Sequence, residues 1–192
     1  MVVDAVLRAL RPRAASTPQP LRLLDLGVGS GCIAVTLACE LPACVVVGVE
    51  LSWVALHTAQ HNLRRHGVAS RVRLVHGRWT EAVRGTFDGI VSNPPYVPSS
   101  QVDGLPLDVR REPRLSLDGG MDGQDALRHL LNAAPLLLGP GGLLALECGE
   151  DQAEPLARLA ETMPGVHRVE VVPDLTTRPR GLLLRRAERR AV

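Results

Sequence analysis

Short apolar runs alternate with amphipathic segments along most of the chain. Short runs rich in Leu and Val predict strands, and apolar positions repeated at a helical spacing predict helices. The expected strands are 21–26, 44–49, 72–75, 87–91, 143–146, 169–172 and 181–184, and the expected helices are 1–13, 32–41, 52–66, 126–138 and 152–162. Such alternation is typical of a parallel sheet with helices on both faces.

The last two expected strands, 169–172 and 181–184, are separated by a short loop that contains proline. A parallel connection needs a crossover of about a dozen residues or more, so these strands should form an antiparallel hairpin at one edge of the sheet. The sequence therefore predicts an α/β fold. We expect a single doubly wound, mostly parallel, seven-stranded sheet of the Rossmann-like kind, with an antiparallel C-terminal edge hairpin.

Proline and small polar residues gather in residues 11–20, which predicts a linker after a first surface helix. We therefore divide the chain into an N-terminal helix and linker (1–20), one folded domain (21–186) and an Arg-rich tail (187–192). A chain of 192 residues is long enough to build one full core.

Composition argues against a membrane or nucleic-acid partner. No apolar run approaches the roughly 20 residues of a membrane helix. The net charge is only +2 and aromatic residues are 2%, so basic surface and platforms for base stacking are both scarce. Four cysteines without a Cys-x-x-Cys pair indicate reduced thiols and a cytoplasmic location. The histidines show no metal-ligand spacing, so we expect no metal, and we expect a monomer.

A glycine-rich turn, Asp25-Leu-Gly-Val-Gly-Ser-Gly31, follows the first expected strand and begins a helix. Its spacing is Gly-x-Gly-x-Gly, whereas dinucleotide sites carry Gly-x-Gly-x-x-Gly. Asp25 would repel a pyrophosphate but attract the ammonium and sulfonium groups of S-adenosylmethionine. We therefore expect that cofactor to be bound by Asp25, Gly27, Val28, Gly29, Ser30 and Gly31. The alternatives are a nicotinamide cofactor and a purely structural turn.

Two further residues after strand ends suit a nucleoside. Glu50 ends the second strand, where a carboxylate can accept both ribose hydroxyls. Trp79 follows the third strand, where its indole face can lie against adenine. The alternatives are an ordinary surface acid for Glu50 and a core tryptophan for Trp79. Trp53 lies inside an expected helix, so we expect it to pack rather than to bind ligand.

The segment Asn93-Pro94-Pro95-Tyr96 follows the fourth expected strand. An amide or amino nitrogen that receives a methyl group becomes tetrahedral, and its N–H groups become more acidic. The side-chain oxygen of Asn93 and the carbonyl of Pro94 can accept from those N–H groups and stabilise the transition state. Tyr96 can stack on the planar group, and the prolines restrict the backbone. The alternative is an ordinary proline-rich turn.

Taken together, these segments resemble the class I S-adenosylmethionine-dependent methyltransferases. More closely, they resemble the protein-(glutamine-N(5)) methyltransferases that modify peptide chain release factors. A second block, residues 108–120, adds Glu112-Pro113 and Leu117-Asp118-Gly119-Gly120 to the likeness, which runs from about residue 23 to 186.

The resemblance implies that residues 21–186 form a methyltransferase domain whose substrate is the glutamine of a Gly-Gly-Gln loop in a release factor. It implies that Gly27 to Gly31, Glu50, Trp79 and Asn93 contact the cofactor, and that Asn93, Pro94, Pro95 and Tyr96 hold the glutamine amide. Two features depart from the family pattern. Arg78 stands where an acid usually precedes the tryptophan, and the N-terminal helical domain of the family is absent, so the chain is expected to be a catalytic domain only.

Two other functions stay open at this point. A DNA or RNA amino-methyltransferase would act on an exocyclic base amine, but it needs basic surface at the site. Residues 97–123 hold three arginines against five acidic residues, which favours a protein substrate. A non-catalytic module that only binds S-adenosylmethionine is the other alternative, and the intact Asn93 segment argues against it.

Overall fold

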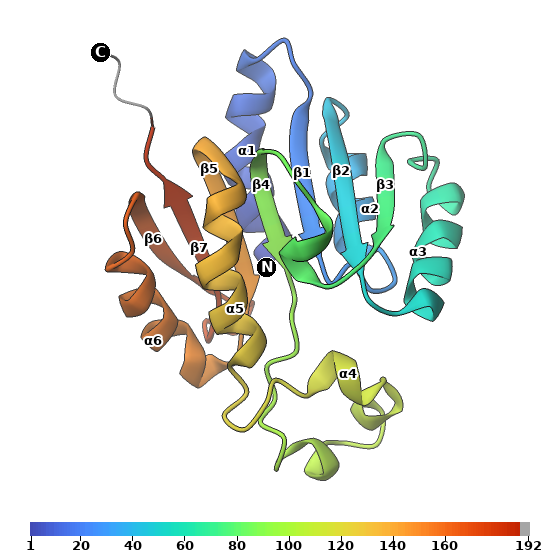
Figure 1. The fold of residues 1–192 in the computed structure, drawn as a ribbon, viewed down its shortest axis with the longest axis vertical. Helices are drawn as coiled ribbons and strands as arrows, with labels where there is room; N and C mark the ends of the chain where they lie inside the picture. The colour runs from blue at the N-terminus through green and yellow to red at the C-terminus, as the bar shows by residue number, and fades with distance from the viewer. Residues whose placement is uncertain (189–192) are drawn as a thin grey trace.

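The computed structural model describes residues 1–188, which build one seven-stranded sheet with helices on both faces (Figure 1). The strands are β1 (Leu21–Leu26), β2 (Cys44–Glu50), β3 (Val72–His76), β4 (Phe87–Ser92), β5 (Leu138–Glu147), β6 (Val166–Pro173) and β7 (Pro179–Arg186). Their order in the sheet is β3-β2-β1-β4-β5-β7-β6. Strands β1 to β5 pair in parallel, whereas β7 is antiparallel to both β5 and β6. The predicted α/β fold and its C-terminal edge hairpin are therefore confirmed.

Helices cover the two faces in separate groups. The helices are α1 (Val2–Ser16), α2 (Cys32–Glu40), α3 (Trp53–Arg65), α4 (Arg114–Leu117), α5 (Asp125–Ala133) and α6 (Glu150–Glu161). Helices α1, α2 and α3 pack on one face, and α5 and α6 pack on the other. Within β1, Leu23 belongs to the first core cluster, and Leu24 and Leu26 belong to the second. Burial on both faces explains why this strand is a nearly continuous apolar run.

Helix α1 is longer and more deeply packed than the sequence predicted. The expected linker began at residue 11, but α1 continues to Ser16 with Pro12 inside it. One face of α1 is buried on the sheet, and Leu10 is 0% exposed. A proline inside a helix costs about 3 kcal/mol, and burying several apolar side chains at about 1.5–3 kcal/mol each offsets that cost. The expected N-terminal helix is present, but the linker start predicted at residue 11 was wrong, because only residues 17–20 separate α1 from β1.

Two other boundaries differ from the prediction for local reasons. The helix expected over 126–138 ends as an α-helix at Ala133 and continues as a 3-10 helix, η4 (Ala134–Leu137), because Pro135 cannot continue the α-helical hydrogen bonds. Strand β5 then begins at Leu138, five residues before the expected start at 143. Of the expected Arg-rich tail (187–192), residues 189–192 lie outside the described part of the chain.

The connection between β4 and α5 forms a lobe beyond the carboxyl ends of the parallel strands (Figure 1). It contains α4 and two short 3-10 helices, η2 (Val102–Gly104) and η3 (Val109–Arg111). The lobe returns to its own start through an isolated bridge between Val97 and Asp118. No helix within residues 1–188 has the length and apolar character needed to cross a membrane.

The packing of α1 generates the first prediction. Leu10 meets β4 closely, because a Cβ added at Gly89 would lie 3.0 Å from a Leu10 methyl group. Leu10→Ala should lower the free energy of unfolding by about 3 kcal/mol, through lost burial and the cavity left behind. Urea unfolding of the variant would measure this. Leu136→Ala, at a side chain that is 78% exposed, serves as the control and should change stability by less than about 0.5 kcal/mol. Equal effects of the two substitutions would show that α1 is not part of the core.

Candidate functional site

Sheet pairing brings the predicted site segments to one edge. Strand β1 lies between β2 and β4, and Asp25 pairs with Gly48 on one side and Val91 on the other. Glu50 lies two residues after Gly48, and Asn93 lies two residues after Val91. The order of strands along the chain reverses between β1 and β4, which is where ligands bind in open α/β sheets. The glycine turn, Glu50 and the Asn93 segment therefore meet at the centre of this edge.

The glycine turn needs its glycines. Gly27, Gly29 and Gly31 have φ angles of +74°, +54° and +87°, in the left-handed region that other residues avoid. Gly31 also allows α2 to approach α3, since a Cβ there would lie 3.3 Å from the Cβ of Ala59. Ser30 is exposed beside them, and Val28 is buried. The turn thus presents backbone to solvent at the end of β1.

Glu50 holds the glycine turn in place. Its Oε2 accepts a hydrogen bond from the Gly29 amide at 2.9 Å. Its Oε1 accepts from the amides of Leu51 and Ser52, also at 2.9 Å each. An ionised carboxylate has about four acceptor positions, so at least one remains for a hydroxyl group of a ligand.

Asp25 is the most unusual side chain of the site. It is 0% exposed, and neither carboxylate oxygen has a hydrogen-bond partner among the described residues. Burial raises the pKa of Asp25 to about 7; the backbone N–H of Ala34 lies near the carboxylate without hydrogen-bonding geometry and opposes the increase, and the nearby charge of Glu50 adds to it. A buried acid without a partner destabilises the fold. It therefore fits a site in which a cationic ligand compensates the carboxylate.

Trp79 packs against the glycine turn. A Cβ added at Gly27 would lie 3.2 Å from the Trp79 ring. Trp79 begins a 3-10 helix, η1 (Trp79–Ala82), with a left-handed φ of +46°, and its side chain also packs on the core cluster beneath α5 and α6. The two alternatives for this residue are therefore combined, because the ring is partly core and partly a wall of the site.

The residue just before the Asn93 segment, Ser92, is held by a hydrogen bond. The hydroxyl of the buried Ser92 donates to the Leu26 carbonyl at 2.6 Å, which joins the ends of β4 and β1. Pro94 is buried and Pro95 is half-buried, whereas Asn93 is exposed and makes no side-chain hydrogen bond within the described residues. The Asn93 amide is thus available at the end of a rigid strand.

Tyr96 is held more firmly than the sequence suggested. Its hydroxyl donates to Glu147 at 3.3 Å and accepts from Arg180 at 2.9 Å. The Arg180 guanidinium also lies over the Tyr96 ring, 5.2 Å from its centroid. Burial raises the pKa of Tyr96, Glu147 adds to the increase, and Arg180 opposes it. Arg180 therefore covers part of the Tyr96 ring, which was expected to stack on the substrate.

The second sequence block folds against the Asn93 segment. The Val97 amide donates to Leu117 at 2.9 Å, and the Gly119 amide donates back to Val97 at 2.8 Å. A Cβ at Gly119 would lie 2.8 Å from the Pro95 carbonyl, so no other residue fits there without a shift. Asp118 closes the turn by accepting from Ser99 at 2.5 Å. This block therefore braces the segment that the sequence marked as catalytic.

Sequence reasoning missed three residues that contact the Asn93 segment: Glu147, Gln152 and Arg180. Gln152 is buried and donates to the Tyr96 carbonyl at 2.9 Å. In the sequence it stands only as a polar residue at the start of an expected helix, and nothing nearby points to Tyr96. Trp53, expected to pack rather than to bind ligand, stacks on the His76 ring with 4.1 Å between centroids, although it is 61% exposed.

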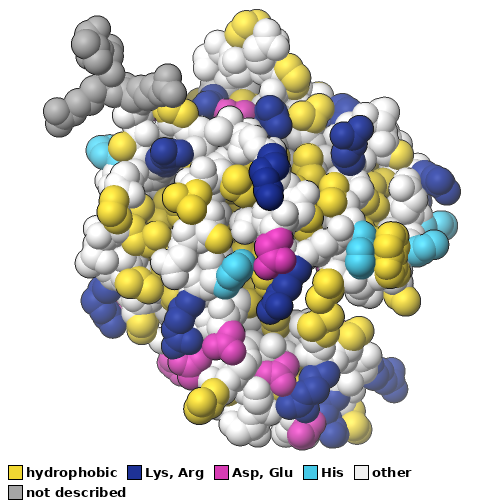
Figure 2. All heavy atoms as spheres, viewed as in Figure 1, with side chains coloured by type: hydrophobic (Ala, Val, Ile, Leu, Met, Phe, Trp, Pro, Cys, Tyr) yellow, Lys and Arg dark blue, Asp and Glu magenta, His cyan; other side chains and the backbone are white. Residues whose placement is uncertain are grey.

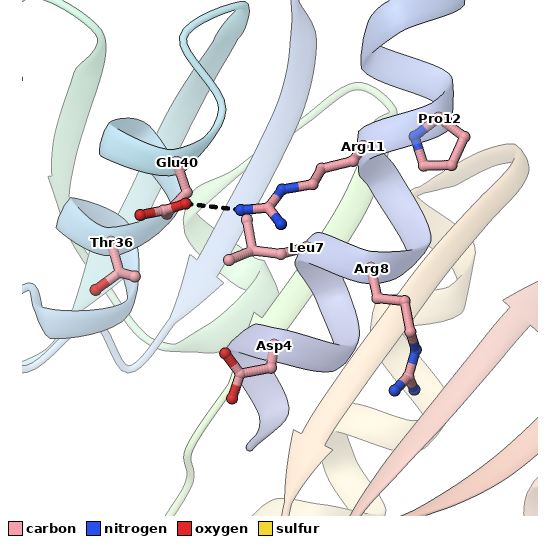
Figure 3. A pocket seen from close by; sticks show the side chains of 7 residues that line it. All are labelled: Asp4, Leu7, Arg8, Arg11, Pro12, Thr36 and Glu40. Carbon is pink, nitrogen blue, oxygen red and sulfur yellow. Dashed lines mark hydrogen bonds and ion pairs between the residues drawn. The ribbon is translucent and has the colours of Figure 1, made fainter.

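Other surface features lie apart from this site. A hollow of about 550 Å³ lies between α1 and α2, where Arg11 pairs with Glu40 beside Leu7, and none of the predicted site residues lines it (Figure 3). Within residues 1–188, no group of three or more His, Cys, Asp or Glu side chains is placed to hold a metal ion. Figure 2 shows basic side chains scattered over the visible face and mixed with acidic ones on the lobe below the sheet.

The raised pKa of Asp25 predicts a pH-dependent stability. Its pKa is near 3.8 in the unfolded chain and about 7 in the fold, so the folded protein binds the proton more tightly. Stability should therefore fall as the pH rises from 4 to 7, by about 4 kcal/mol at about 1.4 kcal/mol per pKa unit. Asp25→Asn should lack this decrease. Urea unfolding of both proteins across this pH range would test it, and parallel curves would contradict it.

The chain is similar in sequence to known methyltransferases. Residues 4–105 match the family model described as methyltransferase small domain. Two curated relatives carry the name release factor glutamine methyltransferase. The one from Moorella thermoacetica is 46% identical over 98% of this chain and 65% of its own length, and the one from Rhodospirillum rubrum is 43% identical over 86% and 51%. The chain thus spans about half to two thirds of the length of these relatives.

A solved structure shows the same fold. The methyltransferase from Pyrococcus furiosus superposes with a TM-score of 0.68 at 22% identity, covering 96% of this chain and 83% of that one. The matched family model covers more than half of the sequence, from α1 to the lobe after β4. The chain therefore belongs to the methyltransferase small domain family.

Proposed function

We propose that this chain transfers a methyl group from S-adenosylmethionine to the side-chain amide nitrogen of a glutamine, and that the substrate is a peptide chain release factor. The observation that carries the proposal is the position of Asn93. Its exposed amide follows β4, which pairs with β1, and β1 carries near its end the buried Asp25, whose carboxylate has no hydrogen-bond partner within residues 1–188. A site for a cationic donor and a site for a flat amide are thus neighbours.

The residues at the sheet edge fit S-adenosylmethionine, which supplies an electrophilic methyl group when bound. The carboxylate of Asp25 suits a positive charge, and Glu50 keeps an acceptor position for a ribose hydroxyl. The turn from Gly27 through Val28, Gly29 and Ser30 to Gly31 offers backbone that a ligand can approach closely. Trp79 provides an aromatic wall beside Gly27.

The Asn93 segment then holds the acceptor. The side-chain oxygen of Asn93 and the carbonyl of Pro94 accept from the two N–H groups of the glutamine amide. These hydrogen bonds strengthen as the nitrogen becomes tetrahedral and its protons more acidic, so they stabilise the transition state more than the ground state. The proton leaves afterwards to water, so no strong general base is required. The rings of Pro94 and Pro95 restrict φ and keep both acceptors in place.

A protein substrate suits the surroundings better than a nucleic acid. The relatives at 43–46% identity are named for release factor glutamine, which supports the same acceptor here. Three arginines of β7 serve the fold. Arg180 binds Tyr96, and Arg185 and Arg186 donate to carbonyls of the segment around Gly141 and Leu138. A base amino-methyltransferase would need that basic surface free.

Asn93→Ala tests the mechanism. Because the amide oxygen is proposed to stabilise the transition state, its loss should lower turnover by roughly 100- to 1,000-fold, as for an oxyanion-hole donor. Donor affinity, measured by calorimetry, should stay within about threefold of the wild type, since the Asp25 and Glu50 carboxylates remain. Wild-type turnover in the variant would rule out the proposed role of Asn93.

The acceptor is identified by a labelled-methyl assay. Release factor, DNA and RNA would be offered side by side with labelled S-adenosylmethionine. Label in the release factor, mapped by mass spectrometry to a glutamine, is the expected result. Label in nucleic acid alone would replace the proposed acceptor with a base amine, and donor binding without any transfer would favour the non-catalytic module.

Arg78→Asp tests the departure beside Trp79. Arg78 is exposed and has no acceptor for the amino group of adenine. A carboxylate at this position can accept from that amino group, so the variant should bind S-adenosylmethionine roughly fivefold more tightly, the effect of a net hydrogen bond of about 1 kcal/mol. Calorimetry would measure it, with Arg78→Ala separating the gain of an acceptor from the loss of a positive charge. Equal affinities for the Asp and Ala variants would contradict the prediction.

A further inference from the structure

Tyr96 is fixed at both its backbone and its side chain by residues outside the Asn93 segment. Gln152, near the start of α6, contacts the backbone, and Arg180, on β7, contacts the side chain. Both contacts are long-range, joining residues 56 and 84 positions apart in the chain. The prolines restrict φ at positions 94 and 95, but they leave Tyr96 itself free to rotate. The position of Tyr96 is therefore set by these other residues.

Both the NH₂ group and the oxygen of the Gln152 side-chain amide form hydrogen bonds with backbone groups, at three positions. Its Nε2 donates to the carbonyls of Tyr96 at 2.9 Å and Gly123 at 3.2 Å, and its Oε1 accepts from the Gly149 amide at 2.8 Å. Gln152 is only 8% exposed, so each of these groups would be left unsatisfied without its partner. Only a side chain with both a donor and an acceptor can satisfy this set of neighbours.

Arg180 and Glu147 complete the arrangement at the other end of Tyr96. The Tyr96 hydroxyl forms two hydrogen bonds: it accepts one from Arg180 and donates one to Glu147. The guanidinium also lies over the ring. Glu147 ends β5, and Arg180 lies in β7, where its carbonyl accepts from the Cys148 amide at 3.0 Å, so both partners are attached to the sheet. A loop residue is thereby connected to the core.

We propose that Gln152 and Arg180 are positioning residues for methyl transfer, which act by holding Tyr96 and, through it, the carbonyl and amide acceptors of the Asn93 segment. The inference rests on the proposed function, in which that segment grips the acceptor nitrogen. A displacement of about 1 Å at a reacting group can cost roughly a hundredfold in rate. Neither residue needs to touch the substrate to have such an effect.

Gln152→Glu is the direct test. The change keeps the size and one acceptor but replaces the donating NH₂ group, so an oxygen then faces the carbonyls of Tyr96 and Gly123. We expect kcat per donor-binding site to fall ten- to a hundredfold while the Kd for S-adenosylmethionine stays within about threefold. Glu154→Gln, on the exposed side of α6, is the matched control and should keep wild-type kcat. Counting donor-binding sites separates lost positioning from lost folding.

Arg180→Met gives a second, independent variant. It should lower kcat per donor-binding site by at least fivefold in the wild-type background. In a Tyr96→Phe background its effect should be smaller, because the hydroxyl that Arg180 holds is already absent. Additive effects of the two substitutions would show that Arg180 does not act through Tyr96 and would overturn this half of the proposal.

A spectroscopic measurement avoids dependence on the acceptor. Tyr96 is the only tyrosine in the chain, so ring-labelled tyrosine gives the NMR signals of this one residue. Gln152→Glu and Arg180→Met should each shift those signals, and Glu154→Gln should leave them unchanged. If the wild type methylates no glutamine, the proposed function fails, but the tyrosine signals still report whether the two residues hold Tyr96. Unchanged signals, or shifted signals with wild-type kcat in both variants, would overturn the inference.

Discussion

Parallel pairing of β1 with both β2 and β4 is the constraint on which the site depends. Asp25 is fixed opposite Gly48 and Val91 by backbone hydrogen bonds, so the ends of three strands reach one edge in register. If β1 shifted by one residue relative to its neighbours, each of its side chains would move to the opposite face of the sheet. Side chains on both faces of β1 pack in core clusters, so such a shift would disrupt both clusters. The carboxylates of Asp25 and Glu50, on β1 and β2, and the Asn93 amide just after β4 therefore keep fixed relative positions.

The loops themselves are held by hydrogen bonds from outside each motif. Glu50 binds the glycine turn, Ser92 binds the end of β1, and the turn around Gly119 braces the backbone at Pro95. The first two contacts join the ends of different strands, and the third lies within the connection that follows β4. Removing one of them would leave a buried polar group without a partner, at a cost of about 1–3 kcal/mol. The edge therefore behaves as one connected unit, and Gln152 extends it to α6.

The sequence predicted what depends on local pattern and missed what depends on distant partners. Alternating apolar runs gave the strands, and the absence of a crossover gave the antiparallel hairpin of β6 and β7. The extent of α1 was missed, because prolines at positions 12, 18 and 20 suggested a linker and only the sheet beneath shows what the helix buries. Likewise, Gln152 and Arg180 carry no local signal, since their meaning comes from Tyr96, 56 and 84 residues away.

The polar groups at this edge fall into two kinds, and the difference indicates where ligands belong. Tyr96 and Gln152 are satisfied by the protein, so they form a frame that needs nothing further to be stable. Among the described residues, Asp25 is buried without a hydrogen-bond partner, and the side-chain amide of Asn93 is exposed without one. A fold does not keep a buried carboxylate of this kind for its own stability, because burial, as the largest cause, raises the pKa of Asp25 to about 7. The cost is consistent with a positively charged ligand that completes the site, beside an amide left open for the group that receives the methyl.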